Sequence, residues 1–260
     1  MEKYYSAISL IIRDENDYLE EWLSHHISIG FEHFYIYDNN SEIPIKDTIS
    51  SLPLEIKTKV TVIDWCGAHK HAQHEQEQHA IKYCRDDCHW LAFIDTDEFI
   101  VLHKHKNIKD FLTDYDEFGG IYIPWVMYNA NGKVKREDKP VMERFTRTCE
   151  NLQVLGKMIV QPKKVEEQHM HQAFYKDEND FSVDEKKNRV SGKRNKCTTD
   201  IIQCNHYYTK SFEEWIAKIA RGVADPWCSR QLSEFFDYNP DLKYLDTGQD
   251  FAQIYEKGFH

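Results

Sequence analysis

Apolar runs alternate with amphipathic segments along the first half of the chain. Four stretches are each long enough for one strand: 7–12, 33–37, 60–65 and 91–94. Between them, apolar residues recur at helical spacing from Leu19 to Ile27, and a long polar helix is expected over 71–86. Repetition of strand, helix and strand predicts an α/β fold with a doubly wound, mostly parallel sheet.

The character of the sequence changes after residue 118. Further short strands are expected at four places: 121–128, 141–145, 157–162 and 201–208. Ser211 can cap a helix that Gly222 ends. The stretch from Tyr175 to Lys196 is almost wholly polar, and we expect a mobile surface loop there. No internal repeat or low-complexity linker interrupts the chain, so residues 1–260 are predicted to form a single domain.

Composition narrows the class of protein. The formal net charge of −11 argues against a general nucleic-acid binder, which would present a basic surface. No apolar run approaches the roughly 18 residues that span a bilayer, and the N-terminus lacks the pattern of a signal peptide. Seven cysteines without a Cys-x-x-Cys pair favour a reduced cytoplasmic protein over a disulfide scaffold.

The apolar run at 91–94 ends in an acidic cluster that contains Asp95 and Asp97. In an extended chain these two side chains would share a side while Thr96 faces away. Two carboxylates on one side suit a hard divalent cation such as Mn²⁺ or Mg²⁺. A chance acidic junction at the end of a strand is the alternative. Asp14, Asp38 and Asp95 follow three of the strands, and parallel strands would gather them at one edge of the sheet.

The polar helix is rich in histidine, and a zinc site has to be considered. His74 and His79 resemble a zincin motif but lie five positions apart, so the two imidazoles would splay around the helix. No cysteine pair has zinc-finger spacing. The pattern therefore favours a solvated helix face over zinc. We expect Gln78 on a different face from His74, where it could reach the crevice at the sheet edge.

A set of motifs in fixed order resembles the family 92 glycosyltransferases and their family-2-like bacterial relatives. The motifs are 13–15 with 18–22, 34–41, 90–99, Trp125 with 131–132, 143–145 and 205–211. They extend over nearly the whole chain. The resemblance implies a GT-A fold, a nucleotide-sugar donor and a divalent metal at Asp95 and Asp97. It assigns 1–118 to the nucleotide-sugar-binding half and 119–260 to the acceptor side. The family usually has Lys-Asn-Glu where this chain has Arg13-Asp14-Glu15.

The chemistry of glycosyl transfer then suggests which residues bind the metal. The leaving group is a nucleoside diphosphate, whose developing charge a bridging metal neutralises. Asp97 is the predicted ligand, with Asp95 helping directly or through the ribose. GT-A enzymes often complete the shell with a late histidine, and His206 fits that position. A hydrogen-bonded core histidine is the alternative for His206, and His169 and His171 are competing ligands.

The remaining roles concern donor and acceptor. The residues predicted to bind the nucleotide sugar are Arg13, Glu15, Asp38, Asn40, Gln78, Asp95, Lys210 and Arg221. Arg13 and Asp38 would hold base and ribose, while Lys210 or Arg221 would meet the diphosphate. Inversion at the sugar requires a carboxylate base, and Glu143 is the candidate because it follows an expected strand in the acceptor half.

The sequence thus predicts a metal-dependent hexosyltransferase that uses a nucleotide sugar, with a UDP-hexose expected. The acceptor would be a glycan or lipid-linked glycan in bacterial surface polysaccharide synthesis. We expect a cytoplasmic location, with or without association with the inner face of the membrane. A metal-dependent phosphohydrolase or nucleotidyltransferase, and a non-catalytic nucleotide-sugar binder, are the alternatives.

Overall fold

The computed structural model describes residues 2–67, 71–149, 155–224 and 229–244. The chain divides into two compact units that are interleaved along the sequence. The first unit comprises Met1–Trp125 and Val154–Cys204, and the second comprises Val126–Gln153 and Asn205–His260. A single domain over 1–260, divided at residue 118 into a nucleotide-sugar-binding half and an acceptor half, stays a prediction.

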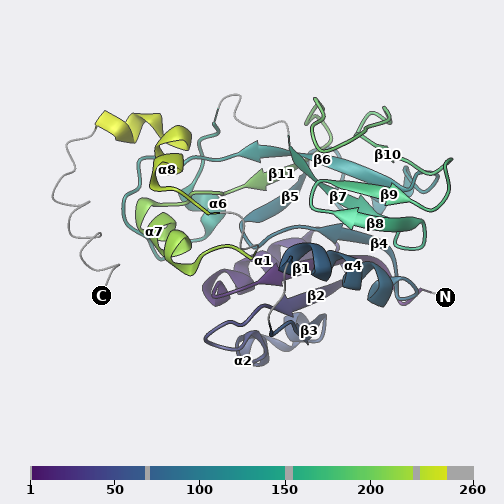
Figure 1. Ribbon diagram of the computed structural model, residues 1–260, viewed down its shortest axis with the longest axis horizontal. Coiled ribbons are helices and arrows are strands. Elements are labelled where there is room, and N and C mark those ends of the chain that lie inside the picture. The colour runs from purple at the N-terminus through teal and green to yellow at the C-terminus, as the bar shows by residue number, and fades with distance from the viewer. Residues whose placement is uncertain (1, 68–70, 150–154, 225–228, 245–260) are drawn as a thin grey trace. The chain divides into compact units, whose positions relative to one another are not determined.

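A nine-stranded sheet forms the framework, in the order β3-β2-β1-β4-β7-β6-β11-β5 with β10 paired to β6 (Figure 1). Its strands are β1 (Tyr4–Ile12), β2 (His33–Asp38), β3 (Val60–Asp64), β4 (Cys88–Phe93), β5 (Glu98–Leu102), β6 (Gly120–Met127), β7 (Gly156–Val160), β10 (Ser182–Val183) and β11 (Ile202–His206). A separate hairpin consists of β8 (Val165–His169) and β9 (Gln172–Tyr175).

The strands from β3 to β4 run parallel, as the alternation of strands and helices predicts. Every residue of β2 is buried, which is typical of a central parallel strand covered on both faces. Strand β7 runs antiparallel to both β4 and β6. The predicted α/β class with a mostly parallel sheet is therefore confirmed.

The helices follow the amphipathic segments. In the first unit they are α1 (Leu19–Ser28), α2 (Ile45–Ser51), α3 (Leu54–Lys57), α4 (Ala72–Cys84) and α5 (Ile108–Thr113). In the second unit they are α6 (Val141–Arg144), α7 (Phe212–Arg221) and α8 (Leu232–Tyr238). Ser211 caps α7 in a reciprocal capping box with Glu214, and Gly222 follows the helix at φ +81°, as the sequence predicts.

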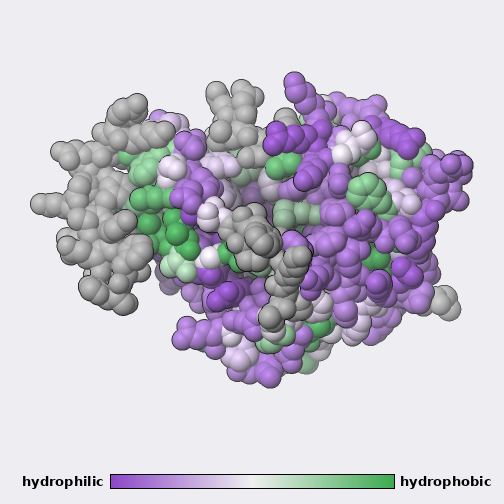
Figure 2. Space-filling model, in the orientation of Figure 1, coloured by the Kyte–Doolittle hydropathy of each residue, from purple (hydrophilic) through white to green (hydrophobic). Residues whose placement is uncertain are grey.

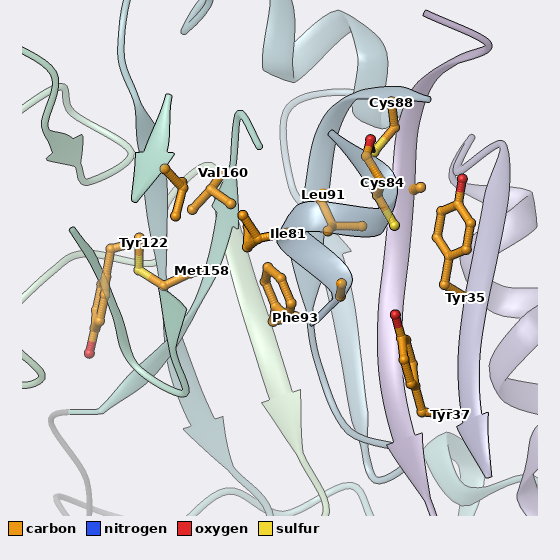
Figure 3. Close-up of a cluster of buried hydrophobic side chains, with 13 residues drawn as sticks. Tyr35, Tyr37, Ile81, Cys84, Cys88, Leu91, Phe93, Tyr122, Met158 and Val160 are labelled. Atoms are coloured by element: carbon orange, nitrogen blue, oxygen red, sulfur yellow. Dashed lines mark hydrogen bonds between the residues drawn. The ribbon is translucent and has the colours of Figure 1, made fainter. Parts of the chain in front are cut away.

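The core of the first unit lies between α4 and one face of the sheet (Figure 3). Ile81 and Cys84 from the helix meet Tyr35, Leu91 and Phe93 from the strands, and all five side chains are buried. Burial of side chains of this size contributes roughly 1.5–3 kcal/mol each. This packing fixes α4 on the sheet.

One prediction about the later chain is wrong, and a second describes its segment incompletely. Residues 141–145 do not form a strand, because Val141–Arg144 make one helical turn after Pro140. The polar stretch after Tyr175 contains β10 and a buried carboxylate, Glu185. Its oxygens accept hydrogen bonds from the backbone N–H groups of 200–202. These hydrogen bonds, together with the burial of Val183, attach part of the segment to the core, while its mobility stays a prediction.

The described part of the chain contains no helix that is both long and apolar enough to cross a bilayer.

Candidate functional site

The loops that follow β1 and β2 are joined at the carboxyl edge of the sheet. Asp14 Oδ1 accepts a hydrogen bond of 2.7 Å from the Glu42 N–H, and the Asp14 N–H donates to Ser41 Oγ at 3.1 Å. Asp14 and Asn40 have φ values of +50° and +59°, a region that Asp and Asn tolerate better than most residues. The predicted meeting of strand ends is thus present for these two strands.

Asp38 is the residue that organises the loop after β2. It is 5% exposed, and its Oδ1 and Oδ2 accept hydrogen bonds from the N–H groups of Ser41 and Ile45 at 3.0 and 2.9 Å. These bonds shape the loop and hold the first residue of α2. The structure therefore gives Asp38 a positioning role, while direct contact with a donor stays a prediction.

Arg13 and Asn40 lie beside this carboxylate network. The exposed Arg13 guanidinium is 3.6 Å from Asp14 Oδ2, so the cation that replaces the usual family lysine lies at the surface of the β1 loop. Asn40 Oδ1 accepts a 3.3 Å hydrogen bond from the Gly67 N–H, which joins the ends of β2 and β3. Both residues lie at the expected edge of the sheet.

The acidic motif after β4 is a tight turn and not an extended segment. The Glu98 N–H donates to the Asp95 carbonyl at 3.0 Å, which closes the turn around Thr96 and Asp97. The expected strand-like alternation of Asp95 and Asp97 is therefore wrong. Thr96 is buried, and its hydroxyl donates to Glu15 of the β1 loop.

Helix α1 fixes this turn through hydrogen bonds from one tryptophan. The indole N–H of the fully buried Trp22 donates to the carbonyls of Asp95 and Glu98, at 3.0 and 2.9 Å. One buried donor therefore fixes both ends of the turn. The amphipathic pattern of the sequence places Trp22 in the core but gives no sign of this contact.

Lys157 of β7 supplies a cation to the turn. Its Nζ is 2.7 Å from Asp95 Oδ2 and 3.4 Å from Glu98 Oε2, and the Lys157 side chain is 2% exposed. Sequence reasoning missed Lys157, although a lysine inside a buried apolar strand is a signal, since lysine is almost never buried without a partner. The nearby carboxylates raise the pKa of Lys157 even though burial lowers it, so the ammonium is charged.

The carboxylates of the turn outnumber this cation. Burial raises the pKa of Glu98 to about 8, Lys157 opposes the shift, and Asp95 and Asp97 add to it. Asp97 itself is 5% exposed. The buried Asp97 and Glu98 and the partly exposed Asp95 make the turn rich in carboxylate oxygens, and such a donor set fits Mg²⁺ or Mn²⁺.

Gln78 on helix α4 lies elsewhere than the sequence predicts. Its amide donates to the Gln168 carbonyl of β8. The prediction that Gln78 and His74 lie on different helix faces is wrong, because residues four apart share a face at 3.6 residues per turn. Gln76 instead reaches the sheet, with its amide 2.7 Å from Ser9 Oγ of β1. A donor-binding role for Gln78 stays a prediction.

Four predicted site residues belong to the second unit. His206 is buried at the end of β11, Lys210 is buried with φ +51°, and Arg221 is the last residue of α7. Glu143 is exposed on α6, so the reason for choosing it, a preceding strand, does not hold. Its neighbour Arg144 is the buried residue, paired with Glu214 at 2.8 and 3.0 Å.

These features define a class of protein: an α/β protein with a mostly parallel sheet and an acidic turn at the carboxyl end of β4, the edge where such folds bind ligands. The particular family follows from sequence comparison. The model of glycosyltransferase family 92 matches residues 4–230, and the chain belongs to this family.

The curated relatives are plant proteins of the same family. One from Arabidopsis thaliana is 23% identical over 276 residues, which cover 98% of this chain and 45% of the relative. One from Ricinus communis is 34% identical over 113 residues, or 44% of this chain and 20% of the relative. One from Oryza sativa subsp. japonica is 25% identical over 143 residues, or 54% and 24%. The chain therefore spans less than half the length of these relatives.

The chain is only weakly similar to solved structures. S. aureus TarS has a TM-score of 0.39 and 15% identity, with 96% of this chain and 80% of that chain covered. The galactosyltransferase LgtC, in complex with donor and acceptor sugar analogs, has a TM-score of 0.34 and 11% identity, covering 61% and 58%. Likenesses of this size carry no argument about activity.

Proposed function

We propose that this chain is a metal-dependent hexosyltransferase that takes its sugar from a nucleotide-sugar donor. The observation that carries the proposal is the buried acidic turn Asp95–Glu98 at the carboxyl end of the parallel strands, in a chain that belongs to glycosyltransferase family 92. A UDP-hexose donor, inversion at the sugar and a glycan or lipid-linked acceptor remain part of the proposal. The role in bacterial surface polysaccharide and the cytoplasmic location stay predictions from the sequence.

Asp97 is the proposed metal ligand, and His206 is the proposed late histidine of the shell. When bound, Mn²⁺ or Mg²⁺ would neutralise the charge that develops on the departing diphosphate. Asp95 has an ammonium partner in Lys157 at 2.7 Å, so in this proposal its carboxylate assists the site and is not the principal ligand. This arrangement supports Asp97, and not Asp95, as the principal anionic ligand.

The loops after β1 and β2 would receive the nucleoside. Asp38 fixes the backbone of the β2 loop, and Arg13 offers an exposed guanidinium on the neighbouring loop. Donor contacts by Glu15, Asn40, Lys210 and Arg221 belong to the same proposal. Glu143 stays a predicted base for the acceptor hydroxyl, and its exposure on α6 would leave it accessible to an acceptor.

The decisive experiment substitutes Asp97→Asn and measures sugar transfer and nucleoside diphosphate release with a panel of UDP-hexoses and Mn²⁺. We expect transfer to fall roughly 100-fold or more because the charge at the turn changes, with the melting temperature preserved. Asp86→Asn, an exposed carboxylate in the turn after α4, is the matched control and should transfer at the parent rate.

Two outcomes would reject the proposal. Full transfer by the Asp97→Asn protein, or by the parent protein in excess EDTA, would exclude metal dependence at this turn. Release of nucleoside diphosphate at the same rate with and without any acceptor would instead favour the phosphohydrolase reading.

A further inference from the structure

A second group of metal-binding side chains lies on the face of α4 that packs against the β8–β9 hairpin (Figure 1). Its members are His74 from the first turn of α4, and Glu167 and His169 from β8. One potential ligand atom from each residue lies within 4.8 Å of the other two. None of the three belongs to the acidic turn at 95–98.

The backbone presents these residues together for two reasons. The amide of Gln78 donates to the Gln168 carbonyl, which fixes β8 on α4 one helical turn beyond His74. Strand β8 contains a register shift between Val165 and Glu167. An extra residue in a strand re-aims the side chains that follow it. As a result Gln168 is fully buried, while Glu167 and His169 share the opposite, accessible side of the strand.

The geometry is close to that of a metal-ligand set. Glu167 Oε1 lies 3.1 Å from His169 Nε2 and 3.6 Å from His74 Nε2. Ligand atoms bound to one tetrahedral zinc at about 2.0–2.1 Å are separated by about 3.4 Å. The two imidazole rings are stacked, with centroids 4.6 Å apart and planes at 24° to each other. His74 Nδ1 is buried without a hydrogen-bond partner among the described residues, which leaves Nε2 as the nitrogen directed at Glu167.

The chemistry of the donors selects the ion. Two imidazoles and one carboxylate suit Zn²⁺, Co²⁺ or Ni²⁺, whereas Mg²⁺ and Ca²⁺ prefer an all-oxygen shell. The three side chains are 36%, 48% and 38% exposed, so an ion can enter from solvent. The visible surface over the hairpin is mostly hydrophilic, with small apolar patches (Figure 2). With three protein ligands, water would fill the remaining coordination positions of the ion.

We propose that His74, Glu167 and His169 form a binding site for a divalent transition-metal ion of the zinc type, which joins the first turn of α4 to the β8–β9 hairpin. The histidine-rich helix thus takes part in a metal site after all. Its partner ligands come from β8 and not from His79 of the same helix, whose Nδ1 is 2.9 Å from the Tyr37 hydroxyl. The proposal is independent of the transferase activity.

The test titrates EDTA-treated full chain with Zn²⁺ by calorimetry, and with Co²⁺ by visible absorption. The Asp97→Asn protein serves as the background, because loss of this carboxylate weakens metal binding at the acidic turn. We expect one Zn²⁺ per chain and the absorption bands of Co²⁺ with nitrogen ligands. His74→Ala and His169→Ala should each weaken Zn²⁺ binding roughly 100-fold, and Glu167→Gln roughly tenfold.

The matched control is His103→Ala, which removes an exposed histidine outside the cluster and should bind Zn²⁺ like its parent. Melting temperatures measured without metal show whether a substitution changes the fold, separately from its effect on Zn²⁺ binding. We expect all variants to melt alike without metal, and Zn²⁺ to raise the melting temperature only where the three ligands are intact. Unchanged Zn²⁺ affinity in His74→Ala or His169→Ala, or no binding by the background protein, would overturn the proposal.

Discussion

The ammonium of Lys157 lies 2.7 Å from the carboxylate of Asp95, although the two residues are 62 positions apart in the chain. The same Nζ is 3.4 Å from Glu98 and lies over the indole ring of Trp125, 5.8 Å from its centroid. The cation is therefore placed by β7, while the carboxylates come from the turn between β4 and β5. The antiparallel pairing of β7 with β4 brings them together.

Lys157→Met should destabilise the protein by about 3–5 kcal/mol, because Asp95 and Glu98 would lose their buried counter-charge. Urea unfolding followed by circular dichroism measures the change. Addition of Mn²⁺ should restore part of the lost stability, since a divalent ion can compensate the same carboxylates. Lys82→Met removes an exposed lysine of α4 and should change stability by less than about 0.5 kcal/mol. Equal stability of the two variants would contradict a compensating role for Lys157.

Asp38→Ala should raise the KM for the donor about tenfold while kcat falls less than about twofold. The substitution removes two acceptors that shape the loop after β2, the proposed donor site, but leaves the reacting bond untouched. Steady-state kinetics with varied nucleotide sugar measure both constants. Asp47→Ala, at an exposed position of α2, is the control and should leave both constants unchanged. Unchanged donor affinity in Asp38→Ala would remove the β2 loop from the proposed donor site.

Arg144→Met should destabilise the protein by about 3–5 kcal/mol, because Glu214 would remain buried without its bidentate partner. The double variant Arg144→Met with Glu214→Gln should recover part of this loss. Glutamine keeps the hydrogen bonds of the capping box with Ser211 but carries no charge. A double-mutant cycle by urea unfolding measures the coupling, and strictly additive effects would contradict the pairing.

The buried His33 should make the protein less stable in acid. Burial lowers the pKa of His33 to about 4, and the charged groups that act on it are Lys3, Lys59 and Asp87. The unfolded chain protonates this histidine near pH 6.5, so between about pH 6.5 and 4 it binds more protons than the folded protein. Stability from the neutral imidazole is thus present above pH 6.5 and is lost as the pH falls toward 4.

His33→Gln should reduce this acid sensitivity by about 1–2 kcal/mol, a value that allows for solvent screening. Glutamine can keep a hydrogen bond to Thr61 Oγ1, which lies 2.8 Å from His33 Nε2. The measurement is the difference in unfolding free energy between pH 7.5 and 4.5 for parent and variant, so that other titrating groups cancel. An identical pH dependence in both proteins would show that His33 is not the source.

Local signals in the sequence were enough for the first four strands of the sheet and for their parallel pairing, but not for their order. Apolar runs such as Ala7–Ile12 and the amphipathic residues of α1 identify strands and helices, since burial follows the period of each element. Alternation of strand and helix then implies parallel pairing. The short turn at Val141–Arg144 was misjudged, because five apolar and charged residues carry too little periodicity to separate strand from helix.

Only the tertiary structure decided which charges share a site. The sequence identifies the acidic motif at Asp95 and Asp97, but the turn geometry, the Trp22 contacts and the Lys157 ammonium come from elements far away in the chain. The same holds for His74, whose partners on β8 are set by a register shift that no local pattern predicts. Periodicity reports which side of an element is buried, whereas the contact between two elements depends on long-range pairing and packing.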